Sequence, residues 1–175
     1  MNIIDTIKPK SDQLNADDLM AGPITVTIQN VTASESEQPI SVEIDGGHKP
    51  YKPCKSMRRV LVRLFGDKAS GWIGKRIRLY CDADVSFSGV KVGGIRISHA
   101  SGINEPASMM LTTTRSKRRE YVVNPLPMYP ADKFSSNLPA IKAAIAANKI
   151  TPAQAIERCR VTGELTDEQI NQVMK

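Results

Sequence analysis

Apolar and polar residues alternate in short runs between Ile24 and Val123, and this pattern constrains the fold more than any other feature of the chain. Successive side chains of a strand point to opposite faces, so such runs predict strands with one buried face. Turn-forming dipeptides such as Gly46-Gly47 and Ser88-Gly89 separate the runs. The pattern predicts strands over 24–31, 40–44, 75–81, 95–99, 109–114 and 120–123, and a tight hairpin over 85–92.

One helix interrupts these strands. Ser56 is suited to cap a helix with an apolar stripe that includes Val60, Leu61 and Leu64, and Gly66 ends it. No strand-helix-strand rhythm repeats, which argues against a parallel sheet. The chain is therefore predicted to be mainly β, with an OB-fold-like antiparallel β-barrel and one internal helix over residues 23–124. Residues 1–22 are predicted to form an N-terminal arm.

The carboxyl end of the chain has a different character. Residues 125–137 begin with a proline-rich run and are predicted to form a linker. Over residues 138–175 the pattern favours three short helices, because Thr151 and Thr166 each begin a capping box and Gly163 is placed to end a helix. A module of about 40 residues has a marginal core of its own, so we expect it to dock on the barrel or on a partner.

Positive charge is concentrated in the middle of the chain. Sixteen of the 24 basic residues lie between Lys49 and Arg119, where four acidic residues oppose them, so this segment carries a formal charge of about +12 against +6 for the whole chain. Such segregation indicates a face that binds a polyanion. The predicted phosphate contacts are Lys52, Lys55, Arg58, Arg59, Lys75, Arg76, Arg78, Lys91, Arg96, Lys117, Arg118 and Arg119.

Aromatic residues are interleaved with these cations. Exposed rings stack on unpaired bases at about 1–3 kcal/mol each, and together with cations they suit single-stranded nucleic acid. The alternative is that the rings form part of the core, because a small domain with few aromatics usually buries them. The candidate stacking residues are Tyr51, Trp72, Tyr80 and Phe87.

Few residue patterns in the chain point to chemistry. His48 and His99 have no Cys, Asp or Glu at metal-ligand spacing, so we expect no metal and no cofactor. Asp82 and Asp84 lie on one side of an extended segment, where a metal-dependent nuclease could use them, but both are also ordinary turn formers. The chain has no leader-like start and no run of eighteen apolar residues. A soluble, cytoplasmic protein that is not an enzyme is expected.

Two segments resemble a group of small proteins of tailed bacteriophages and prophages. They are Lys49–Leu61 and Gly89–His99, and the resemblance extends over residues 20–125. It implies a setting in phage recombination or replication, inside a bacterial host cell, and a role in binding single-stranded DNA. The helical carboxyl end is similar to that of phage single-strand annealing proteins, whereas familiar single-stranded DNA-binding proteins end in an acidic tail.

These observations favour a non-enzymatic, single-stranded DNA-binding protein of a phage or prophage. The carboxyl-terminal helices are predicted to engage a phage or host recombination or replication protein. The alternative is a protein-binding accessory or inhibitor of a host nuclease, recombinase or defence protein, in which the basic patch would match an acidic partner. A nuclease that uses Asp82 and Asp84 is a third possibility.

Overall fold

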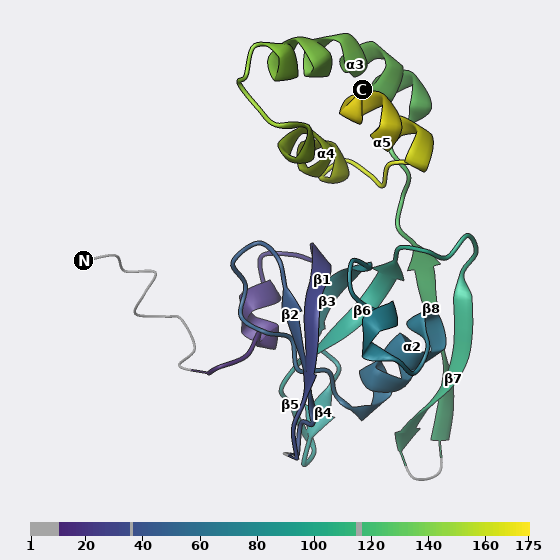
Figure 1. Cartoon of the computed structure of the whole chain (residues 1–175). Helices are drawn as coiled ribbons and strands as arrows, with labels where there is room; N and C mark the ends of the chain where they lie inside the picture. The colour runs from purple at the N-terminus through teal and green to yellow at the C-terminus, as the bar shows by residue number, and fades with distance from the viewer. Residues whose placement is uncertain (1–10, 36, 115–116) are drawn as a thin grey trace. The chain divides into compact units, whose positions relative to one another are not determined.

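A computed structural model describes residues 11–35, 37–114 and 117–175. The chain divides into two units, Met1–Pro125 and Leu126–Lys175, and each is considered by itself. In the first unit the short helix η1 and the strands β1 and β2 precede helix α2, and the remaining strands follow it (Figure 1). The elements are η1 (Ala16–Leu19), β1 (Ile24–Ala33), β2 (Ile40–Ile44), α2 (Lys55–Phe65), η2 (Ala69–Gly71), β3 (Arg76–Asp82), β4 (Ser86–Phe87), β5 (Val90–Lys91), β6 (Gly94–Ala100), β7 (Ala107–Thr114) and β8 (Lys117–Pro125).

Six of these strands form one sheet in the order β2-β1-β3-β6-β8-β7, and β4 and β5 form the predicted hairpin. Ser88 and Gly89 both have positive φ at its turn, as the dipeptide predicts. Neighbouring strands of the large sheet are antiparallel except β6 and β8, which run parallel through His99 and Ala100. The predicted strands are thus confirmed, but Lys117–Arg119, which fall between the predicted strands 109–114 and 120–123, lie at the start of β8.

The chain is mixed α/β rather than mainly β, because its helices and strands contain similar numbers of residues. The six-stranded sheet is open, so a closed barrel is not confirmed. Within the described residues β2 and β7 are the two ends of the ladder and do not pair with each other. β1 pairs with β3 through Ile24–Thr27 and with β2 through Ile28–Ala33, so β2 occupies the edge of β1 at which a barrel would close. The outer edge of β2 is itself bridged by Tyr51.

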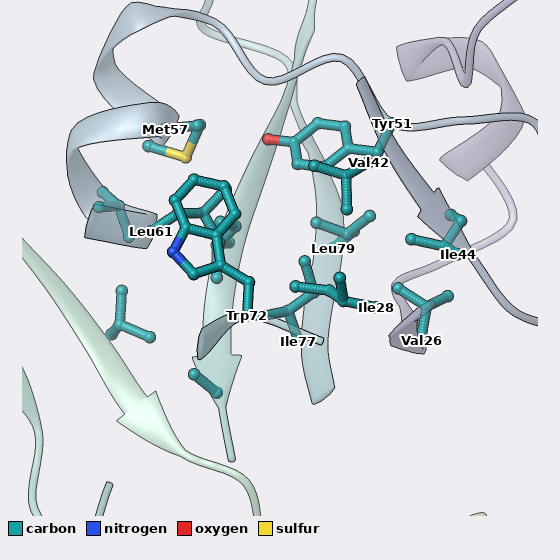
Figure 2. Packing of buried hydrophobic residues seen from close by; sticks show 14 of the residues in the cluster. Val26, Ile28, Val42, Ile44, Tyr51, Met57, Leu61, Trp72, Ile77 and Leu79 are labelled. Carbon is teal, nitrogen blue, oxygen red and sulfur yellow. The ribbon is translucent and has the colours of Figure 1, made fainter. Parts of the chain in front are cut away.

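The core of the first unit follows from the alternation. Ile77 and Leu79 of β3 are fully buried beside Val26 and Ile28 of β1 (Figure 2). Helix α2 packs against β6 and β7 and buries Met57, Val60 and Leu61, and Gly66 ends it as predicted. Burial of each large apolar side chain contributes about 1.5–3 kcal/mol. Cys54, rather than Ser56, is the N-cap residue of α2.

Part of the predicted N-terminal arm belongs to the first unit. Leu14 and Leu19 are buried in its core, and the backbone N–H of Leu14 donates to the carbonyl oxygen of Pro50 at 2.9 Å. Asn15 and Asp18 form a capping box that holds η1. The prediction of a separate arm is therefore wrong for residues 11–22, because two leucines spaced five apart bury enough apolar surface to hold this segment. Residues 1–10 lie outside the described residues.

The second unit contains the three predicted helices, α3 (Ala131–Ala146), α4 (Pro152–Arg160) and α5 (Asp167–Met174). Both capping boxes are confirmed, since Thr151 Oγ1 accepts from the Gln154 N–H at 3.2 Å and Thr166 Oγ1 from the Gln169 N–H at 3.1 Å. The predicted linker is wrong beyond Pro130, because α3 begins seven residues before residue 138.

Burial explains the early start of α3. Tyr129 and Phe134 are buried, and their rings meet edge to face with centroids 5.9 Å apart. Pro139 lies inside α3, and a proline inside a helix removes one backbone hydrogen bond. The prolines at 125, 127 and 130 suggested a linker that extends to residue 137, but burial of the two rings in the core of the second unit favours a helix from Ala131.

At Gly163 two backbone segments of the second unit approach each other closely. A Cβ on this residue would lie 2.6 Å from the backbone nitrogen of Tyr129, which itself donates to the carbonyl oxygen of Glu164 at 2.7 Å. We expect Gly163→Ala to destabilise the second unit by about 1–3 kcal/mol, because the backbone must move to admit the methyl group. Far-UV circular dichroism follows its helices, while Trp72 fluorescence reports the first unit separately.

The control is Ala146→Ser, which adds one atom at an exposed position of α3. It should leave helix melting unchanged. Equal melting of Gly163→Ala and the parent chain would contradict the close approach.

Candidate nucleic-acid interface

Two of the four predicted stacking residues are buried in the core. Only 2% of Tyr51 and 4% of Trp72 is exposed, and the Trp72 Nε1–H donates to the carbonyl oxygen of Gly66 at 2.8 Å. Neither ring can stack on a base without partial unfolding, so the prediction is wrong for both and the core alternative holds. Their large apolar area is the physical reason, because α2 and β3 would otherwise enclose a cavity.

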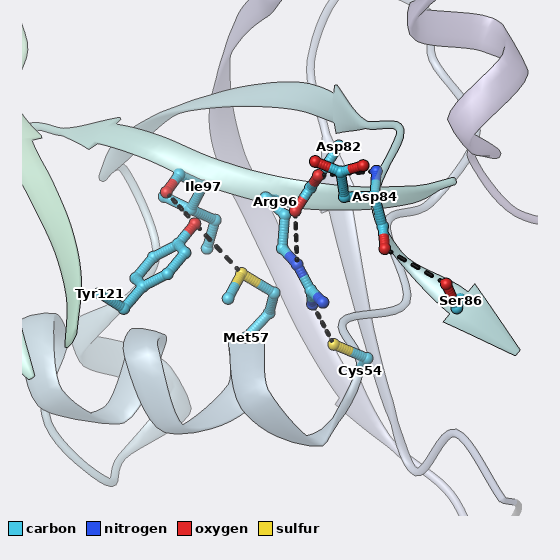
Figure 3. Close-up of polar contacts among 8 residues, drawn as sticks. All are labelled: Cys54, Met57, Asp82, Asp84, Ser86, Arg96, Ile97 and Tyr121. Carbon is cyan, nitrogen blue, oxygen red and sulfur yellow. Dashed lines mark hydrogen bonds and ion pairs between the residues drawn. The ribbon is translucent and has the colours of Figure 1, made fainter. Parts of the chain in front are cut away.

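Tyr80 is half-buried and reaches the surface of the sheet. The side chain of Phe87 lies outside the described part of the structure. Tyr121, which the sequence analysis did not select, lies near Tyr80, and its hydroxyl donates to the carbonyl oxygen of Ile97 at 2.6 Å (Figure 3). Burial, and secondarily Tyr80, raises the pKa of Tyr121 well above its usual range, so its hydroxyl remains a donor.

The exposed side of α2 is basic. Lys55 and Arg59 are exposed, and Arg63 continues the same row at a spacing of four residues, whereas Arg58 is half-buried. No acidic residue occurs anywhere in α2. Arg63 was missing from the predicted contacts, although the spacing of 55, 59 and 63 was a signal that could have identified it.

A second basic group lies at the start of β8. Lys117, Arg118 and Arg119 are all exposed. Because they belong to a strand, their side chains alternate: Arg119 pairs with Leu111 on the inner face and Arg118 with Thr112 on the outer face. Two groups of exposed cations are thus defined, the α2 row (Lys55, Arg59 and Arg63) and the β8 start (Lys117, Arg118 and Arg119).

The basic residues of β3 are less accessible. Only 7% of Arg76 is exposed, so it is not a surface contact and the prediction for it is wrong. Arg78 and Lys75 are half-buried, and Arg78 Nε donates to Thr25 Oγ1 at 3.1 Å. Alternation places Arg76 and Arg78 on the face of β3 opposite Ile77 and Leu79, but it does not predict how far the surrounding structure covers them.

The three remaining cations have acidic partners. Lys52 Nζ lies 2.7 Å from Asp12, Lys91 Nζ lies 2.7 Å from Asp84, and Arg96 Nε lies 3.7 Å from Asp82. Hydrogen bonding within the exposed pair lowers the pKa of Asp84 and raises that of Lys91. Exposed pairs of this kind stabilise the fold little, and a phosphate can compete for their cations.

A cleft of about 620 Å³ brings three predicted residues together, namely Tyr80, Arg96 and Arg119. It forms because β6 and β8 pair only at His99 and Ala100 and then separate. Ser56 and Met57 of α2 form another wall. Asp82, Asp84 and Glu120 also line the cleft, so its charge is mixed.

The two aspartates proposed for a nuclease form a turn. The backbone N–H of Asp84 donates to Asp82 Oδ1 at 3.1 Å, as in an Asx turn, and both carboxylates have a basic neighbour (Figure 3). In the described part of the chain, no group of three or more His, Cys, Asp or Glu side chains is placed to hold a metal ion.

Comparisons with protein-family models, with curated proteins and with solved structures each found no match. The resemblance to phage proteins therefore stays a prediction. Among the described residues, no helix has the length and apolar character needed to cross a membrane.

Two buried or half-buried tyrosines of the first unit provide a matched test of these contacts. Tyr121→Phe removes the hydrogen bond to the Ile97 carbonyl and should lower the free energy of unfolding by about 1 kcal/mol. Tyr51→Phe removes a buried hydroxyl that has no hydrogen-bond partner in the described residues, so stability should stay equal or rise.

Urea unfolding followed by Trp72 fluorescence measures both variants in the unit that contains them. The same loss of stability in Tyr51→Phe as in Tyr121→Phe would contradict these assignments.

Proposed function

We propose that the first unit binds single-stranded DNA without catalysing a reaction, through phosphate contacts from the α2 row and the β8 start. The observation that carries this proposal is the accessible positive charge on these two elements, in a segment with a formal charge of about +12. Lys and Arg side chains that contact phosphates release condensed counterions, and this release favours binding at low salt.

The Tyr80 cleft supports a preference for single strands. An unpaired base can enter a cleft of about 620 Å³ and stack on Tyr80, while Arg96 and Arg119 contact the adjoining phosphates. A base within a duplex is already stacked and paired, so it gains nothing from this ring. With Tyr51 and Trp72 in the core, electrostatic contacts supply most of the affinity.

The order of the strands supports an open relative of the OB-fold. The five longest strands are β1, β3, β6, β7 and β8. The first three form an antiparallel meander, and β7 and β8 form a hairpin in which β8 runs parallel to β6. OB-folds bind oligonucleotides on strands 2 and 3 and on the loops between strands 1 and 2 and strands 4 and 5. In this count, those places correspond to β3 with β6, to the segment that contains α2, and to the β7–β8 connection.

The biological setting rests on the sequence resemblance. We propose a role in phage or prophage replication or recombination in the cytoplasm of a bacterial host. In this proposal the second unit binds a recombination or replication protein.

The β8 start provides the test of DNA binding. Arg118→Ala with Arg119→Ala should weaken binding of a labelled oligodeoxythymidylate and reduce the slope of log K against log salt by about 1.4, since each lost single-strand contact contributes about 0.7. Fluorescence anisotropy between about 50 and about 200 mM salt measures both quantities.

Lys133→Ala with Lys149→Ala is the matched control, because it removes the same charge from exposed positions of the second unit. The slope of log K against log salt for this control should equal that of the parent chain. Equal losses in the two double variants, or none in either, would contradict a localised site.

A protein-binding role is the second candidate, and the surface of the second unit favours it. Val161 is 88% exposed, and an apolar groove of about 330 Å³ lies between α3 and α4, with Ile141, Ala144 and Ile150 in its walls. Under this alternative, the chain binds a host nuclease, recombinase or defence protein. A purified candidate that binds after nuclease treatment, and that Ala144→Glu releases without loss of helix content, would favour this role.

A further inference from the structure

The two outer strands of the six-stranded sheet differ in how their free edges are covered. The edge of β2 is closed, because Val42 and Tyr51 exchange two backbone hydrogen bonds, at 2.9 and 2.8 Å. β7 forms the other end of the sheet (Figure 1). Among the described residues of the first unit, no strand and no isolated bridge pairs with β7 on the side away from β8. β7 therefore presents an open edge.

The sequence of β7 does not protect this edge. Natural edge strands usually avoid pairing with other chains through charged residues, prolines or bulges. β7 reads Ala-Ser-Met-Met-Leu-Thr-Thr-Thr and contains neither a charged residue nor a proline. Its register with β8 shifts only between Thr112 and Thr114, so Ala107–Thr112 is a regular segment. In an antiparallel ladder every second residue directs its N–H and C=O away from the neighbouring strand, so half of these backbone groups face outward.

The rest of the sheet supports the β7–β8 hairpin only in part. β8 pairs with β6 only through Asn124 and Pro125, at its carboxyl end. Over Lys117–Val123 the ladder therefore consists of β7 and β8, with α2 packed against β7 on one face. A two-stranded ribbon is marginally stable in water, and further strands or a packed helix stabilise it. A strand added at the β7 edge would extend the ladder where it is narrowest.

Exposed apolar side chains lie on the face of the hairpin opposite Leu111, which is buried. Met110 of β7 is 61% exposed, and Val122 of β8 is 42% exposed. Met110 pairs with Glu120, and Val122 pairs with Ser108, so both apolar side chains point to the same face. Met110 belongs to the edge strand itself, so a strand added there would cover it directly.

A second copy of this chain fits the open edge. A strand without charge meets no like charge when it faces itself, and antiparallel pairing about a twofold axis lets both copies use the same outward groups. The β8 start pairs with Leu111–Thr114, the carboxyl end of β7. Antiparallel pairing therefore sets the two basic clusters at opposite ends of the joint, where they repel each other least. Each copy closes the edge of the other, so the assembly ends at a dimer.

We propose that two copies of the chain pair antiparallel through β7, so that their hairpins form one four-stranded ladder in the order β8-β7-β7-β8. About six main-chain hydrogen bonds along Ala107–Thr112 join the copies, together with contacts of Met110. The dimer does not depend on DNA binding. It places two α2 rows and two β8 starts in one assembly.

Sedimentation equilibrium of the full chain, without nucleic acid and up to about 100 μM, tests this proposal. A reducing agent keeps the exposed Cys54 from forming a disulfide. A monomer–dimer equilibrium is expected. Met110→Lys places a charge on the edge and should raise the dissociation constant at least about tenfold, with unchanged Trp72 fluorescence. A parent chain that stays monomeric would overturn the proposal.

Val161→Lys is the matched control, because it makes the same kind of change at a side chain of the second unit that is 88% exposed. It should leave the dissociation constant unchanged. Equal weakening by Val161→Lys and Met110→Lys, or weakening by Val161→Lys alone, would overturn pairing through β7.

A charge exchange separates a lost interface from a damaged fold. Met110→Glu should also favour the monomer, whereas an equimolar mixture of Met110→Lys and Met110→Glu should form heterodimers, because opposite charges then face each other across the joint. Sedimentation with a fluorescent label on one variant detects the mixed species. A mixture that stays monomeric while the parent chain dimerises would overturn the proposed pairing.

Amide hydrogen exchange identifies the edge involved. In the parent dimer, every second amide of Ala107–Thr112 should exchange more slowly than in Met110→Lys, while the amides bonded to β8 stay protected in both. Equal exchange of all these amides in the parent dimer and the variant would place the interface elsewhere and overturn the proposal.

Discussion

The fold of the first unit depends on β1, which pairs with two different strands along its length. Ile24–Thr27 pair with β3 and Ile28–Ala33 with β2, and the register with β2 shifts between Ile28 and Asn30. Since β2 takes the edge at which a barrel would close, the sheet remains open. Tyr51 bridges the outer edge of β2, so the chain enters α2 with its first turn beside β6 and Arg96. Through β2 and Tyr51, β1 is thereby connected to the segment that leads into α2.

The same short segments provide the core and the charge. In β3, Ile77 and Leu79 enter the core while Arg78 lies on the opposite face, and in α2 Val60 and Leu61 are buried while Lys55 and Arg59 are exposed. Burial of the apolar residues stabilises the elements that hold the cations, so the charged surfaces need few ion pairs of their own. The half-buried Tyr80 belongs to both the packed and the charged parts of the unit, because it lies near Tyr121 and lines the cleft beside Arg96.

The sequence was sufficient to predict features that depend on local pattern. Alternation of apolar and polar residues identified the strands. Gly66 predicted the end of α2, and Thr151 and Thr166 predicted the starts of α4 and α5. Properties set by distant contacts were not predictable: Trp72 is buried because α2 and β3 enclose it, and Arg76 is covered although its strand face is polar. The start of α3 at Ala131 depends on the contact between Tyr129 and Phe134, which outweighs nearby prolines. β6 and β8 pair only at His99 and Ala100. Which strands become neighbours in a sheet depends on contacts between distant segments, so this pairing could not be predicted from the sequence.

The central claim is that single-stranded DNA contacts the cations of the first unit while Trp72 remains in the core. Its most direct test is an amide NMR titration of the full chain with a short oligodeoxythymidylate at low salt, in which the Trp72 indole N–H provides an internal reference. The account predicts shifts at Lys55, Arg59, Tyr80 and Arg118, with little change in the indole signal, because that N–H is bonded to the Gly66 carbonyl. Shifts confined to the second unit, or a large displacement of the indole signal, would contradict it.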